Sequence, residues 1–205
     1  MELLKANNSS DALKLLAEKE FQNQNIRVCY EIIKKIEEID LYYLDVVPLY
    51  CSCMIELDKT GDLYFLAHKL VSSNPNLGIS WFAVGCYYFY IKKYETARKF
   101  FQKSNSLDKH FAPGWIAFGH CFASQNESDQ AMAAYRTAAR LFPGCYYAHL
   151  CIGMEYLRTN NLRTALLSLN EANNINDTDP QIYNEIGVVH YKDCLLYTSP
   201  SPRDS

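Results

Sequence analysis

Four glycines recur at a fixed interval along this chain of 205 residues. Gly85, Gly119, Gly153 and Gly187 lie 34 residues apart, and each lies within an apolar run typical of a helix. A glycine inside a helix costs roughly 1 kcal/mol relative to alanine. Four such glycines at one spacing therefore indicate a repeated packing demand, a helix crossing too close for a side chain. A period of this length is typical of an array of helix pairs rather than of an ordinary globular domain.

Other residues repeat together with the glycines. When residue 78 opens a repeat, the fourth position holds an aromatic residue or histidine, and the twentieth and twenty-seventh positions hold small residues. The repeat opened by Ala112 carries the pattern most fully, as Trp115, Gly119, Ala131, Tyr135 and Pro143. This spacing resembles the tetratricopeptide repeat. The resemblance implies an all-α fold, a right-handed superhelix built as a solenoid of helix–turn–helix units.

The repeat register also predicts the organisation of the chain. Extended in both directions, it gives five full repeats and the first helix of a sixth, which together make eleven helices over residues 10–192. We expect an N-terminal extension at residues 1–9 and the repeat array at residues 10–193. Residues 194–205 abandon the register and hold prolines at 200 and 202, which a helix interior does not accept. We expect this segment to be an irregular tail, and we suspect that it is foreign sequence.

Composition excludes several classes of function. The net charge is −3 and we find no basic stripe, so nucleic acid is not expected as a partner. The longest apolar stretch covers residues 79–91 and is too short to cross a bilayer, so no membrane association is expected. Eight cysteines without an export signal are typical of reduced thiols, which predicts a location in the nucleus and cytoplasm.

The sequence offers little that could carry out chemistry. The repeated glycines are spread through helices and form no phosphate-binding loop. The five histidines show no metal-ligand spacing, and His120 and Cys121, as neighbours in a helix, point about 100° apart. We therefore predict no catalytic residue, no metal site and no cofactor, and we expect a protein that is not an enzyme.

A binding groove is the remaining candidate for function. The resemblance implies that the concave groove is lined by the second, fifth, ninth, twelfth and thirteenth positions of each first helix. Here these positions are largely apolar, which favours binding of a peptide or subunit over plain packing within a longer superhelix. A clamp for acidic chaperone tails is not expected, because its positions hold Phe82, Cys86 and Ala117. The predicted groove residues are Ile79, Phe82, Cys86, Tyr90, Ile116, His120, Tyr147, Leu150, Met154 and Asn184.

Several stretches resemble one family in more detail. Residues 80–86 (SWFAVGC), 115–120 (WIAFGH), 129–139 (DQAMAAYRTAA) and 185–189 (EIGVV) are similar to the sixth-subunit family of the anaphase-promoting complex. That resemblance implies a scaffold within a ubiquitin ligase of mitotic cell-cycle progression, with catalysis on other subunits. It implies other subunits of the complex as partners, including the N-terminal segment of a small accessory subunit held in the groove. It further implies a homodimer for the full-length protein, of which this chain is a fragment.

Two alternatives of other classes stay open. One is a general tetratricopeptide adaptor in motor-driven or other transport. The other is the substrate-binding superhelix of an enzyme whose catalytic domain is missing. Such enzymes carry a ladder of asparagines along the groove, and here only Asn184 lies on the predicted lining. The rest of the reading frame distinguishes these readings, since further repeats favour the scaffold and a catalytic domain favours the enzyme.

Overall fold

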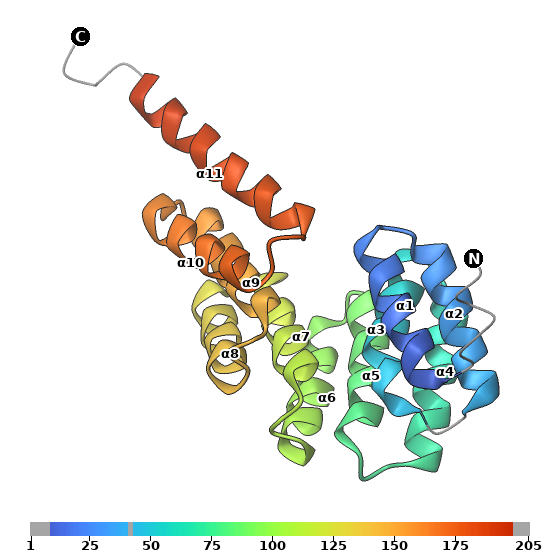
Figure 1. The fold of residues 1–205 in the computed structure, drawn as a ribbon. Coiled ribbons are helices and arrows are strands. Elements are labelled where there is room, and N and C mark those ends of the chain that lie inside the picture. The colour runs from blue at the N-terminus through green and yellow to red at the C-terminus, as the bar shows by residue number, and fades with distance from the viewer. Residues whose placement is uncertain (1–8, 41–42, 199–205) are drawn as a thin grey trace. The chain divides into compact units, whose positions relative to one another are not determined.

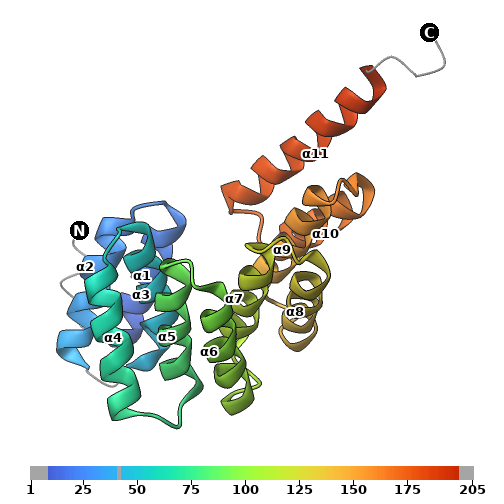
Figure 2. The ribbon, with the colours of Figure 1, turned by 180° about the vertical axis from the view of Figure 1, so that it is seen from behind.

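The computed structural model of the protein describes residues 9–40 and 43–198 (Figures 1 and 2). Residues 1–8 of the predicted N-terminal extension lie outside this description, and Ser9 is extended (φ −78°, ψ 132°) directly before the first helix. The chain forms two compact units, divided after Gly114.

The first unit is built from three helix pairs. A 3₁₀ turn, η2, leads into the third helix, where a proline occupies the first turn. The elements are α1 (Ser10–Gln22), α2 (Ile26–Ile39), η2 (Leu44–Val46), α3 (Val47–Glu56), α4 (Thr60–Ser73), α5 (Gly78–Tyr90) and α6 (Tyr94–Leu107).

The second unit continues the same pattern, and its first helix begins just before the division. Its elements are α7 (Ala112–Ala123), α8 (Ser128–Leu141), α9 (Tyr146–Arg158), α10 (Leu162–Ile175) and α11 (Pro180–Thr198). All second helices of the chain begin 34 residues apart, at Ile26, Thr60, Tyr94, Ser128 and Leu162.

The predicted all-α helix–turn–helix fold is confirmed. Over residues 9–40 and 43–198 the structure has eleven α-helices and no strand. The right-handed superhelical path of the whole array stays a prediction.

Three of the four repeated glycines meet the packing demand that their spacing predicts, whereas Gly187 has no such neighbour among the described residues. A Cβ atom added at Gly119 would lie 2.4 Å from a ring carbon of Tyr135, on the second helix of the same repeat. Tyr135 is only 2% exposed, so its ring has little room to move aside. Added Cβ atoms would likewise lie 2.5 Å from Phe101 at Gly85 and 2.7 Å from Leu169 at Gly153. We call each of these contacts a glycine socket.

The turn between the two helices of each repeat follows one backbone pattern that the sequence did not reveal. Two or three residues after the first helix ends, one residue has positive φ. The amide of the residue after it donates a hydrogen bond to the carbonyl five residues back, as from Asn161 N–H to the Tyr156 carbonyl at 2.8 Å. Glycine or asparagine usually fills such a position, yet Lys92 (φ 61°) adopts it here. The five residues are Gln24, Asp58, Lys92, Asn126 and Asn160, again 34 apart.

The C-terminal boundary is where the sequence prediction was wrong. We expected irregular structure from Cys194, but α11 continues to Thr198. No residue between 194 and 198 breaks a helix, and the restriction from Pro200 falls on the residue before it. Residues 199–205 of the predicted tail lie outside the described residues.

Gly119 and Gly187 offer a matched test of the glycine socket. Nothing among the described residues lies within 4 Å of a Cβ added at Gly187, so alanine fits there freely. Both substitutions to alanine gain the same helix propensity, so their difference isolates overpacking against Tyr135. We expect Gly119→Ala to be less stable than Gly187→Ala by about 1–3 kcal/mol in urea unfolding. Equal stabilities would mean that the ring moves aside and that the glycine is not required.

Candidate peptide-binding surface

The sequence-predicted groove residues lie on four first helices. In the first unit they belong to α5, and in the second to α7, α9 and α11. Within a helix, the second, fifth and ninth positions share one side because successive residues turn by 100°.

In the first unit, two of the four predicted residues are core residues. Phe82 is 5% exposed, and its ring packs edge-on against Phe111 with centroids 5.1 Å apart. Cys86 is 6% exposed. Ile79 and Tyr90 are half-buried, and the Tyr90 hydroxyl donates a hydrogen bond to the Asp58 carboxylate on the preceding turn. Only Ile79 and Tyr90 therefore remain as candidates for ligand contact on α5.

In the second unit, Ile116 and Leu150 are also core residues. Ile116 packs in a cluster with Ala148 and Cys151. Leu150 is fully buried and packs in a second cluster with Ile182 of α11. The fifth position of a first helix is thus covered by the next first helix, so its apolar character reflects stacking between repeats rather than a ligand.

Four predicted residues of the second unit keep accessible surface. His120 and Tyr147 are half-buried, with ring centroids 6.1 Å apart in an edge-on contact. Met154 is 38% exposed, and Asn184 is exposed on α11. Gln181 lies beside Met154, with its amide nitrogen 3.9 Å from the sulfur. These side chains combine apolar surface with amide groups, a composition suited to an extended peptide.

His120 is electrically neutral in this environment. Its Nδ1 atom lies 2.8 Å from the Tyr135 hydroxyl. Burial lowers the pKa of His120 to about 4 and raises the pKa of Tyr135 well above its usual value. At neutral pH the pair therefore offers hydrogen bonds but no charge.

A polar cluster beside this surface was not among the predicted site residues. The Arg158 guanidinium donates to the nearly buried Glu155 carboxylate at 2.7 Å, to Asn126 Oδ1 at 2.6 Å and to Ser128 Oγ at 2.7 Å. Arg158 holds the same repeat position as Tyr90, and each binds the positive-φ turn residue of the preceding repeat. The thirteenth position of a repeat therefore forms a hydrogen bond to the preceding repeat. In both cases the two partners lie 32 residues apart, and this shared spacing could have revealed the contact in the sequence.

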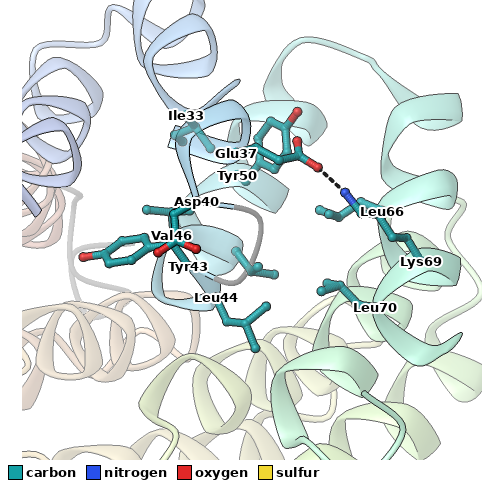
Figure 3. Close-up of a pocket in the computed structure, with 11 residues that line it drawn as sticks. Ile33, Glu37, Asp40, Tyr43, Leu44, Val46, Tyr50, Leu66, Lys69 and Leu70 are labelled. Carbon is teal, nitrogen blue, oxygen red and sulfur yellow. Dashed lines mark hydrogen bonds and ion pairs between the residues drawn. The ribbon is translucent and has the colours of Figure 1, made fainter. Parts of the chain in front are cut away.

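The first unit also contains a small cavity between α2, η2, α3 and α4 (Figure 3). Its volume is about 40 Å³, enough for a few water molecules and too small for a substrate. Glu37 and Lys69 form an ion pair of 2.6 Å at its edge. Tyr43 and Leu44 line another side (Figure 3). We assign this cavity to imperfect packing between repeats.

In the part of the chain that the structure describes, no group of three or more His, Cys, Asp or Glu side chains is arranged to hold a metal ion. No helix there has the length and apolar character needed to cross a membrane.

The low pKa of His120 predicts a dependence of stability on pH. In the unfolded chain His120 takes up a proton near pH 6.5, whereas in the fold it stays neutral until about pH 4. Its contribution to stability is thus complete above pH 6.5 and declines as the pH falls toward 4. We expect His120→Gln to lose less unfolding free energy than the wild type between pH 7 and pH 4.5, with exposed His110→Gln as control. Identical slopes for all three proteins would contradict this assignment.

Known proteins match the repeats and are similar in sequence over most of the chain. The tetratricopeptide repeat family model matches residues 79–111 and 112–145. Anaphase-promoting complex subunit 6 of Arabidopsis thaliana is 44% identical over 184 residues, covering 90% of this chain and 34% of that protein. The cell division cycle protein 16 homolog of Homo sapiens is 41% identical over 183 residues, covering 89% and 30%. The chain thus spans about a third of the length of these relatives.

Solved structures give the same relationship. The crystal structure of the APC/C hetero-tetramer Cut9-Hcn1 superposes with a TM-score of 0.86 at 37% identity, over 94% of this chain and 38% of that one. A tetratricopeptide repeat protein from Thermus thermophilus, TTC0263, superposes with a TM-score of 0.71 at 14% identity over 92% of this chain and all of its own, which shows the fold alone. The chain is therefore an array of tetratricopeptide repeats related in sequence to subunit 6 of the anaphase-promoting complex.

Proposed function

We propose that this chain is part of a non-catalytic scaffold subunit of the anaphase-promoting complex, acting in mitotic cell-cycle progression. The observation that carries the proposal is identity of 44% to anaphase-promoting complex subunit 6 of Arabidopsis thaliana over about nine-tenths of the chain. The repeats present helix surfaces to partners, which suits assembly rather than catalysis. A subunit of this complex would reside in the nucleus and cytoplasm.

We further propose that the accessible first-helix residues hold the N-terminal segment of a small accessory subunit. The related Cut9 was crystallised together with Hcn1, which makes a protein of that kind the natural candidate. On this chain the contact would use Tyr147, Met154 and Asn184 of the second unit. The buried members of the predicted set would act by shaping the helices that present these side chains.

The related assembly is a hetero-tetramer of two named proteins, so at least one of them is present in more than one copy. This supports a homodimer for the full-length protein. The buried fifth-position side chains on α7 and α9 favour repeat stacking, and they leave the dimer contact to other parts of the protein.

Binding of Hcn1 tests the proposed surface. We expect purified Hcn1 to bind the chain in titration calorimetry. We expect Met154→Glu with Asn184→Ala to weaken binding about tenfold or more, since a charge then replaces an apolar side chain of the proposed surface. Leu167→Glu is the matched control, because this side chain is 62% exposed on the second helix α10. Circular dichroism establishes that each variant folds.

Equal weakening by Leu167→Glu, or full binding by the double variant, would contradict the surface. If neither Hcn1 nor any subunit of the complex associates with the folded chain, the scaffold proposal itself is wrong.

A further inference from the structure

A set of aromatic rings runs across three helices on one side of the first unit. Trp81 and Tyr88 of α5 both stack with Phe100 of α6, with centroids 5.8 and 5.2 Å apart and interplanar angles of 6° and 15°. From Tyr88 the contacts continue through Tyr87 to Tyr64 of α4, each at 5.3–5.4 Å, and then to Phe65. We call these six side chains the aromatic ladder: Trp81, Phe100, Tyr88, Tyr87, Tyr64 and Phe65.

The aromatic ladder lies away from the proposed groove. Trp81 and Tyr88 hold the fourth and eleventh positions of α5, whereas Ile79 holds the second. At 100° per residue Trp81 and Tyr88 lie well over 90° around α5 from Ile79, whereas Tyr87 lies about 80° from it, as an estimate from helix geometry. Part of the ladder is open to solvent, since Phe65 is 75% exposed and Tyr64 is 49% exposed. Large exposed apolar side chains in contact with one another are typical of interaction sites.

Positive charge gathers beside the ladder, although the chain as a whole carries a small negative charge. Residues 92–110 hold six Lys or Arg against two Asp or Glu, a net charge of +4 in a chain of net charge −3. Lys99 and Lys103 lie one turn apart and are exposed on α6. The Lys103 ammonium lies over the Trp81 ring, 3.2 Å from its centroid. This cation–π contact joins the positive charge directly to the ladder.

The lysines of this face are available to a partner. Across the described residues no ion pair involves Lys92, Lys93, Lys99 or Lys103. Helix α5 contains no charged residue that could neutralise them. We call these four lysines and the aromatic ladder together the α6 face.

We propose that the α6 face binds an acidic segment of a partner protein, with carboxylates on the lysines and apolar side chains against the ring edges. Charge complementarity selects an acidic partner. Nucleic acid fits less well, because bases stack on free ring faces, whereas Phe100 already stacks with Trp81 and Tyr88 and the Lys103 ammonium lies over the Trp81 ring. This inference goes beyond the scaffold proposal and does not depend on the groove.

The test uses a short fluorescein-labelled peptide of Glu and Asp with one Phe and one Pro. We expect saturable binding by fluorescence anisotropy that weakens with salt, and a loss of about tenfold or more for Lys99→Glu with Lys103→Glu, equivalent to about 1.4 kcal/mol. The control is Lys19→Glu with Lys35→Glu, which makes the same charge change at exposed positions of α1 and α2. Circular dichroism establishes that both variants fold.

A second readout places the peptide on the ladder. The chain has two tryptophans, so Trp115→Phe leaves Trp81 as the only one, and we expect its emission to shift on binding. Three results would overturn the proposal: no saturable binding, equal loss in the control variant, or no change in Trp81 emission. Competition by single-stranded DNA at equal charge concentration would also overturn it and would indicate a nucleic-acid surface instead.

Discussion

The fold depends on the contact between a small residue in the first helix and a large side chain in the second. At Gly119 and Tyr135 the helices approach so closely that a Cβ atom would lie 2.4 Å from the ring. The cost of a helical glycine, roughly 1 kcal/mol, is offset by burial of a large side chain. Because no helix pair buries both its faces alone, pairs joined in this way stack on one another. The accessible side chains of each first helix become a repeated surface on which partners can assemble.

Much of this fold could be predicted from the sequence because it depends on spacing. The helix starts, the helix count and the three occupied glycine sockets follow from one 34-residue period. The turn was not predictable in the same way, since backbone hydrogen bonds force positive φ on Lys92 as readily as on Asn160. The end of α11 was misplaced because the repeat register stops before the helix does.

The candidate site was predicted less well for a related reason. Apolar residues at groove positions look alike in sequence whether the next repeat or a ligand covers them, and Leu150 and Phe82 proved to be buried. Polar contacts between repeats, such as Arg158 with Asn126, involve residues far apart in the sequence and depend on the stacking geometry. The α6 face was missed because a small negative net charge hides a local positive cluster.

The central claim is that glycine sockets give the array its stability, and hydrogen exchange resolved by mass spectrometry tests it most directly. Gly119 forms a glycine socket with Tyr135. At Gly187 in α11, no described atom outside its own helix backbone lies within 4 Å of an added Cβ. The account predicts slow exchange across α7 and α8, and much faster exchange over residues 180–192. Equal protection in the two regions would contradict it, because stability would then not depend on an occupied socket.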